Sequence, residues 1–139
     1  MLDKKLFYIN GKWVSSIEPK SIKVIDPSNE EVCAEISLGG KKDVDNAVSA
    51  AKKAFESWAF TSKEEKLELL EKLYVIYKKR WAEMAKLISL EMGAPMKFST
   101  EMQAATGASH IKSFKNILKD FKFEKDLGDE KNNQKLLYE

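Results

Sequence analysis

Cysteine and histidine are almost missing from this sequence of 139 residues, which contains one of each, Cys33 and His110. A lone cysteine cannot close an intramolecular disulfide, and such usage is typical of a reducing compartment. One cysteine and one histidine this far apart cannot form a metal cluster. Cys33 lies in an alternating strand pattern with no nearby histidine, so we interpret it as a strand cysteine rather than a nucleophile. His110 shares a helical face with apolar residues and is interpreted as a structural rather than a catalytic histidine.

The sequence also lacks an excess of charge, and Arg80 is its only arginine. Charged residues make up 33% of the chain, but the formal net charge is only +2. No strong field is therefore available to hold a polyanion. The planar arginine fork that recognises phosphate and guanine is nearly absent. We therefore predict no nucleic-acid partner.

Long hydrophobic runs are missing as well. The first residues carry an early acid, Asp3, and no apolar run follows, so we predict neither a secretory signal nor a membrane span. A cytoplasmic location is the resulting expectation. With 43% hydrophobic residues, the chain is long enough to bury most of its apolar surface in one core, which predicts a single soluble domain over residues 1–139.

Residues 1–40 have the pattern of short β-strands. Asn10-Gly11 between two short apolar runs predicts a β-hairpin. A second apolar run at 21–25 is closed by Asp26-Pro27, because proline and turn-forming residues stop a strand. An alternating run at 32–38 ends at Gly39-Gly40, which no phosphate-binding pattern follows, so we predict a strand-to-helix turn there.

Residues 41–122 have helical periodicity. Apolar residues spaced on one face predict a helix over 43–58. Thr61 and Ser62 each have a glutamate three residues later, as a capping box requires, and predict a second helix that runs to Met92 and stops at Gly93. Its apolar arc has two stripes, which predicts neighbours on two sides. The first comprises Leu67, Leu70, Tyr74, Tyr77, Trp81, Met84, Ile88 and Met92, and the second comprises Leu69, Ile76 and Leu87.

A third helix is predicted over 98–121, but its apolar stripe changes face around Ala104, Ala105, Gly107 and Ala108. Small residues there would allow another backbone to approach closely; a break at Gly107 is the alternative. Residues 123–139 are predicted to form a loop over 126–134 and then the start of an oligomerisation strand at 135–138. The fold class is thus α/β and mostly helical, with a hairpin and short strands followed by three helices.

Four segments in a fixed order resemble the start of the NAD(P)-dependent aldehyde dehydrogenase superfamily. They contain Ile9-Asn10-Gly11-Lys12-Trp13, Ile25-Asp26-Pro27-Ser28-Asn29, Asp43-Val44-Asp45-Asn46-Ala47-Val48 and Glu91-Met92-Gly93-Ala94-Pro95. The sequence departs from the family at Asp26, where asparagine is commoner, and at Met92, where threonine is frequent. Each motif is weak alone, but the four at family spacing are specific.

The resemblance implies the N-terminal part of a Rossmann-type cofactor domain, in an enzyme that oxidises an aldehyde to a carboxylate with NAD or NADP. The family's cysteine nucleophile, general-base glutamate and glycine-rich cofactor turn match nothing here, so we expect a truncated segment that has no catalytic or cofactor-binding residues and is inactive alone. The implied partners are the rest of the polypeptide and further copies in a homo-oligomer. We expect self-association through Leu69, Ile76, Leu87 and the 135–138 strand.

The resemblance also implies a monovalent cation site formed by the carbonyls of Val24 and Ile25 and the carboxylate of Glu91. A carboxylate that simply hydrogen-bonds the turn is the alternative role for Glu91. A stand-alone helical protein-interaction module is the competing interpretation of the whole chain, because an exposed apolar helix would suit it equally.

Overall fold

The computed structural model describes residues 2–18, 20–126 and 135–137. The strands are β1 (Leu2–Lys4), β2 (Leu6–Ile9), β3 (Lys12–Ser15), β4 (Lys20–Asp26), β5 (Glu31–Leu38), β6 (Glu124–Asp126) and β7 (Lys135–Leu137). The helices are α1 (Lys41–Trp58), α2 (Lys63–Lys79), α3 (Trp81–Met92), α4 (Met96–Phe98), the π-helical segment η1 (Ser99–Gln103) and α5 (Ala104–Asp120). The α/β class and the order of strands before helices are as predicted.

The hairpin β2–β3 forms where Asn10-Gly11 predicts it. Both turn residues have positive φ angles, 53° at Asn10 and 75° at Gly11, as a type I′ turn requires. Tyr8 and Trp13 face each other across the strands with ring centroids 5.2 Å apart. The turn chemistry therefore sets the register of this hairpin.

A second sheet has the order β1-β5-β4, with β4 antiparallel and β1 parallel to β5. The sequence predicted β4 and β5 but missed β1, because three residues beginning at Leu2 have no periodicity to detect. The pairing shifts between Val24 and Ile25, which pair with Ala34 and Val32, so Cys33 is the extra residue of a bulge in β5.

Helix α1 forms as predicted. The β2–β3 hairpin lies beside a row of alanine residues on this helix. A hollow between them is lined by Tyr8, Ile9, Asn10 and Gly11 of the hairpin and by Ala47, Ala50, Ala51 and Ala54 of α1. Alanine side chains allow the hairpin backbone to approach the helix closely.

The predicted single helix to Met92 is wrong, because the chain breaks into α2 and α3 at Arg80. Arg80 has φ −98° and ψ 11°, and its N–H is shared between the carbonyls of Ile76 and Tyr77, each at 3.1 Å. No glycine or proline marks the break. Helix α2 packs against α5 whereas α3 packs against η1. The bend follows from two different packing partners, which local sequence does not reveal.

The predicted third helix is a continuous helical path that begins two residues earlier, at Met96, and contains a π-helical turn at 99–103. One extra residue in a turn rotates every later side chain by about 100°, which accounts for the change of apolar face in the sequence. Helix α5 continues through Gly107, so the alternative of a break there is wrong.

The small residues of this path do admit a close neighbour. The Tyr77 hydroxyl donates to the Ala104 carbonyl at 2.9 Å. A Cβ at Gly107 would lie 2.4 Å from the same hydroxyl oxygen. Ala104 and Ala108 are buried. The first apolar stripe of α2 therefore packs against α5 through its tyrosine.

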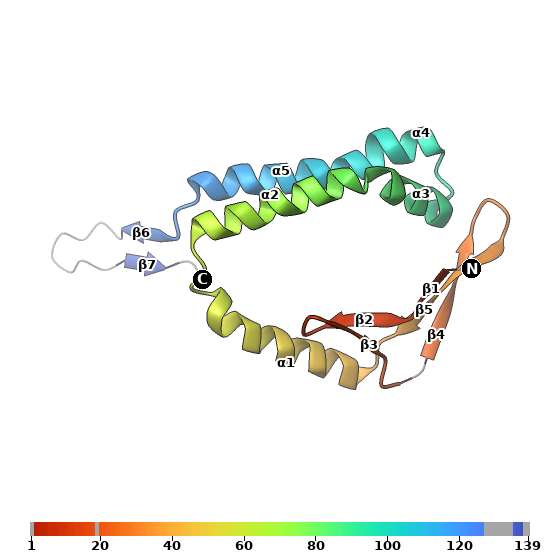
Figure 1. Cartoon of the computed structure of the whole chain (residues 1–139), viewed down its shortest axis with the longest axis horizontal. Helices are drawn as coiled ribbons and strands as arrows, with labels where there is room; N and C mark the ends of the chain where they lie inside the picture. The colour runs from red at the N-terminus through yellow and green to blue at the C-terminus, as the bar shows by residue number, and fades with distance from the viewer. Residues whose placement is uncertain (1, 19, 127–134, 138–139) are drawn as a thin grey trace.

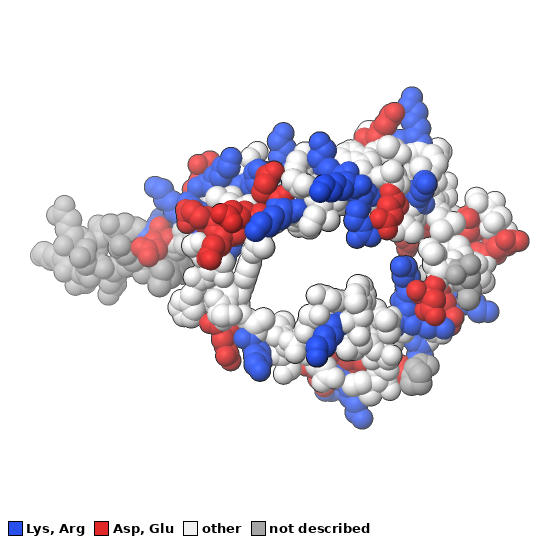
Figure 2. Space-filling model, in the orientation of Figure 1, with Lys and Arg blue, Asp and Glu red and all other residues white. Residues whose placement is uncertain are grey.

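The elements form an open ring, in which α1 and the hairpin lie opposite α2, α3 and α5 (Figure 1). Figure 2 shows an opening through the space-filling surface between these two sides. The buried apolar residues of the described ranges are four alanines: Ala34, Ala85, Ala104 and Ala108. Large side chains remain exposed, with Phe60 at 88% and Trp13 at 67%. The expected core that buries most of the apolar surface is therefore absent from the part of the chain that the structure describes.

Strands β6 and β7 form an antiparallel ribbon that extends away from the ring (Figure 1). The predicted strand is present at 135–137, while residues 127–134 and Tyr138 lie outside the described residues. Among the described helices, none has the length and apolar character needed to cross a bilayer.

Candidate functional site

The two residues that the sequence offered as candidates for catalysis are Cys33 and His110. The Cys33 thiol is half-buried on β5 and donates to the Val24 carbonyl at 3.4 Å. His110 is exposed on α5. Within the described ranges, no group of three histidine, cysteine or acidic residues could hold a metal ion. Cys33 is therefore a strand residue, as the sequence indicated.

The structure brings together the two elements of the predicted cation site. Helix α3 contacts β4, and its C-cap Gly93 packs on Pro27 of the turn that follows β4. A Cβ at Gly93 would lie 2.7 Å from Pro27 Cγ. Glu91 is exposed near this end of α3, and the β4–β5 ladder is interrupted between Val24 and Ile25, opposite the bulge at Cys33. The three residues thus belong to neighbouring elements, and the bound cation stays a prediction.

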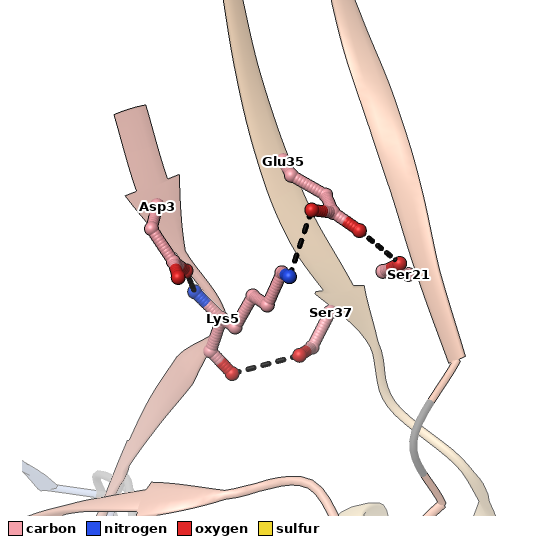
Figure 3. A network of polar contacts seen from close by, with 5 residues as sticks. All are labelled: Asp3, Lys5, Ser21, Glu35 and Ser37. Carbon is pink, nitrogen blue, oxygen red and sulfur yellow. Dashed lines mark hydrogen bonds and ion pairs between the residues drawn. The ribbon is translucent and has the colours of Figure 1, made fainter. Parts of the chain in front are cut away.

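A polar network joins β1 to the rest of its sheet (Figure 3). The Lys5 ammonium lies 2.7 Å from one Glu35 oxygen, and the Ser21 hydroxyl donates to the other at 2.5 Å. The Ser37 hydroxyl donates to the Lys5 carbonyl at 2.7 Å. The hydrogen bond from Lys5 lowers the pKa of Glu35, with a further contribution from Ser21. No local pattern could have revealed this pair, because its members are far apart in the sequence.

Asp43 is a second polar anchor and is only 5% exposed. Its carboxylate accepts from the Ile17 N–H at 2.9 Å, the Ser16 hydroxyl at 2.8 Å and the Gly40 N–H at 3.0 Å. These bonds, first that from Ile17, lower the pKa of Asp43. The Glu18 carboxyl also lies against Gly40. Asp43 thus caps the N-terminus of α1 through the Gly40 N–H. The position of this acid, three residues after Gly40, was the sequence signal for the cap.

An aromatic cluster surrounds Lys66 where α1, α2 and the segment after α5 meet. The ammonium lies 5.6 Å from the ring centroid of Trp58 and 5.5 Å from that of Phe123. Phe121 packs edge-on against Phe123 at 5.0 Å. Cation–π contacts of this kind connect α2 to the end of α1 and to the segment after α5.

An apolar groove lies at the break between α2 and α3, with a volume of about 160 Å³. Its apolar lining consists of Leu73, Ile76, Tyr77, Met84 and Leu87. Arg80 and Glu83 stand at its rim as a two-point ion pair, with both N–O distances 2.8 Å. Two of the three residues of the second stripe, Ile76 and Leu87, line the groove, and both are exposed. The sequence predicted the stripe but not the groove, because the groove depends on the break.

Comparison with known proteins identifies the chain's relatives. The profile described as the aldehyde dehydrogenase family matches residues 13–138. The 3-succinoylsemialdehyde-pyridine dehydrogenase of a Pseudomonas species is 41% identical over 129 residues, which are 92% of this chain and 27% of that enzyme.

Solved structures agree with this comparison. Aldehyde dehydrogenase from Bartonella henselae superimposes with a TM-score of 0.90 at 51% identity, over 94% of this chain and 28% of that one. Aldehyde dehydrogenase C from Pseudomonas syringae, solved with NAD+ and octanal, superimposes with a TM-score of 0.86 at 36% identity, over 89% of this chain and 26% of that one. The chain spans about a quarter of the length of these relatives. The chain therefore belongs to the aldehyde dehydrogenase family.

Proposed function

We propose that this chain is the N-terminal packing segment of an NAD(P)-dependent aldehyde dehydrogenase. The complete enzyme would oxidise an aldehyde to a carboxylate by attack of a cysteine thiolate, hydride transfer to the nicotinamide and hydrolysis of the thioester. This segment, residues 1–139, would act as one unit that supports the cofactor domain. Its own residues would take no part in the reaction.

The observation that supports this proposal is the exposure of large apolar side chains on both sides of the open ring, such as Phe55 of α1 and Ile76 of α2. Figure 2 shows the opening between the two sides. An apolar surface of this extent marks a contact with other protein. The relatives supply an obvious source, since about three quarters of their length has no counterpart here. The stand-alone interaction module would also explain the exposure, but not the match to this enzyme family.

The test is reconstitution. The chain is expressed with the part of the Bartonella henselae enzyme that follows the matched segment, and NADH formation is measured with a panel of aldehydes. We expect activity from the mixture and none from either part alone. NADH formation by the chain alone that survives Cys33→Ser would overturn the proposal, as would failure of the two parts to associate.

We also propose a monovalent cation between the carbonyls of Val24 and Ile25 and the Glu91 carboxylate. Hard oxygen ligands suit such a cation, and the C-terminus of α3 adds negative potential at the same place. The Val24 carbonyl accepts a hydrogen bond from the Cys33 thiol at 3.4 Å, and a carbonyl oxygen has two lone pairs. Anomalous scattering from a rubidium-soaked crystal of the reconstituted enzyme should show a peak at these oxygens. Absence of a peak would remove the site, even with Glu91 pointing towards them.

The complete enzyme is further proposed to be a cytoplasmic homo-oligomer. The projecting β6–β7 ribbon supports this, because the edge of a two-stranded ribbon can pair with a strand of another chain. Sedimentation of the reconstituted enzyme with and without residues 124–139 should show loss of the oligomer in the shortened form. An unchanged mass would contradict it.

A further inference from the structure

The groove at the α2–α3 break is the most enclosed part of the uncovered apolar stripe. Leu73 and Ile76 enter it from α2, and Met84 and Leu87 enter it from α3. All four are between 38% and 53% exposed. Another face of α2 is already covered by α5, whereas the groove side chains remain exposed.

The polar atoms of the two aromatic residues beside the groove, Tyr77 and Trp81, are hydrogen-bonded to backbone carbonyls. Tyr77 lines the groove with its ring, while its hydroxyl is turned to the Ala104 carbonyl at 2.9 Å. The ring of Trp81 packs edge-on against Tyr77, and its indole N–H donates to the Thr100 carbonyl at 3.0 Å. An occupant therefore meets a rigid apolar floor and needs no hydrogen-bonding group of its own.

The rim is also neutral. Arg80 and Glu83 neutralise each other through two contacts of 2.8 Å. Lys4 of β1 is close enough to Glu83 to contribute to the lowering of its pKa, after the larger effect of Arg80. The contribution of Lys4 shows that this rim lies on a side of α3 near β1.

We propose that this groove docks an uncharged apolar segment of the polypeptide that follows the matched region in full-length aldehyde dehydrogenases. The inference rests on the proposed function. A neutral rim and an apolar lining select an apolar strand or helix over a charged one. The relatives supply a source for such a segment, because about three quarters of their length has no counterpart here.

Two adjacent residues of α2 provide a matched pair for the test. Ile76 lines the groove and is 53% exposed; Val75 lies outside it and is 43% exposed. Both are β-branched, and one helical step turns Val75 about 100° away from Ile76. The variants Ile76→Glu and Val75→Glu therefore place the same charge on the same helix at similar exposure in the isolated chain.

We expect Ile76→Glu to weaken association with the downstream part of the Bartonella henselae enzyme by about a hundredfold or more, because docking would bury the new carboxylate against an apolar segment. Val75→Glu and Ile76→Leu should bind like the unmodified chain. Equal binding by Ile76→Glu and Val75→Glu would overturn the groove and leave the proposed function standing. Failure of the unmodified chain to bind would overturn both.

A labelling experiment avoids any effect of a new charge on folding. In a Cys33→Ser background, Leu73→Cys and Val75→Cys are labelled with a maleimide before and after the parts are combined. Leu73→Cys should be protected by about tenfold or more in the complex, while Val75→Cys stays reactive. Unchanged labelling of Leu73→Cys, or its protection in the isolated chain at rising concentration, would overturn the proposal. The second result would assign the groove to another copy.

Discussion

At the β-strand end of the ring, buried or half-buried carboxylates join segments far apart in the sequence, whereas along the helical side small residues let neighbouring helices approach closely. Asp43 and Glu35 each accept hydrogen bonds from two or more other segments or strands. In the helices, Gly107 leaves room for Tyr77, whose hydroxyl donates to the Ala104 carbonyl, and an ion pair between Lys115 and Glu71 also joins α5 to α2. A chain with few buried apolar residues is thus held mainly by carboxylate networks at one end and by close helix approach at the other.

The two kinds of joint respond to different changes. An added methyl group disturbs a close approach but leaves a carboxylate network intact. A change of pH or salt acts on the network and leaves the close approach intact.

Gly93→Ala should have the largest effect. It combines a positive φ of 67° with a Cβ placed 2.7 Å from Pro27 Cγ. We expect the free energy of unfolding to fall by about 2–4 kcal/mol, from left-handed strain plus overpacking. Urea unfolding followed by circular dichroism measures this.

Gly11→Ala is the matched control, since Gly11 has φ 75° and nothing within 4 Å of its Cβ position. It should cost only the strain, about 1–2 kcal/mol. Pro27→Ala should recover part of the Gly93→Ala loss. Equal losses at the two glycines would show that the contact between α3 and the turn after β4 contributes nothing.

Gly107→Ala should have the next largest effect. Its Cβ would lie 2.4 Å from the Tyr77 oxygen and 2.8 Å from Tyr77 Cζ, so the tyrosine must move and lose its bond to Ala104. Overpacking, partly offset by the helix propensity of alanine, predicts a net loss of about 1–2 kcal/mol.

The loss should be smaller in a Tyr77→Phe background, which removes the nearest atom. Lys112→Ala, at an exposed position of the same helix, should leave unfolding nearly unchanged. A stabilising Gly107→Ala would mean that α2 and α5 do not approach each other as closely as described.

Asp43→Asn tests the polar end through pH. The folded chain lowers the pKa of Asp43 below its ordinary 3.8, so its contribution to stability is complete above that value and is lost as pH falls through the folded pKa. Asp43→Asn should melt at a lower temperature at neutral pH, and the difference should shrink towards about pH 3. Melting curves over this range measure it. A difference that is constant with pH would assign the effect to the lost hydrogen-bond geometry alone.

Glu35→Gln should have the smallest effect. Its partner Lys5 has a side chain that is 42% exposed, and exposed ion pairs are screened by salt. We expect a slight lowering of the melting temperature at low salt that vanishes near about 1 M salt. If the loss persisted at high salt, the Ser21 hydrogen bond rather than the ion pair would be the stabilising contact.

The elements that the sequence predicted well are those whose signals are local. Ser62 caps α2 through its bond with the Glu65 N–H, and the Glu65 carboxylate returns to the Ser62 N–H at 3.0 Å. Gly93 ends α3 in the left-handed conformation. The β2–β3 turn follows from Asn10 and Gly11 in the same way. Each depends on residues within one turn of the chain.

The site was less predictable than these elements. The second stripe was visible, because periodicity shows which residues share a face of a helix. The groove was not, because Arg80 breaks the helix only when α2 and α3 follow different partners. Glu35 and Lys5 meet only after β1 pairs with β5.

By itself, the sequence determined where turns, caps and helical faces lie, since backbone preferences and side-chain spacing act over a few residues. The tertiary structure decided the bend at Arg80, the π-helical turn before Ala104, the addition of β1 and the opening in the ring. These features depend on the free energy of contacts between segments that are distant in the chain. No window of sequence contains both partners of such a contact.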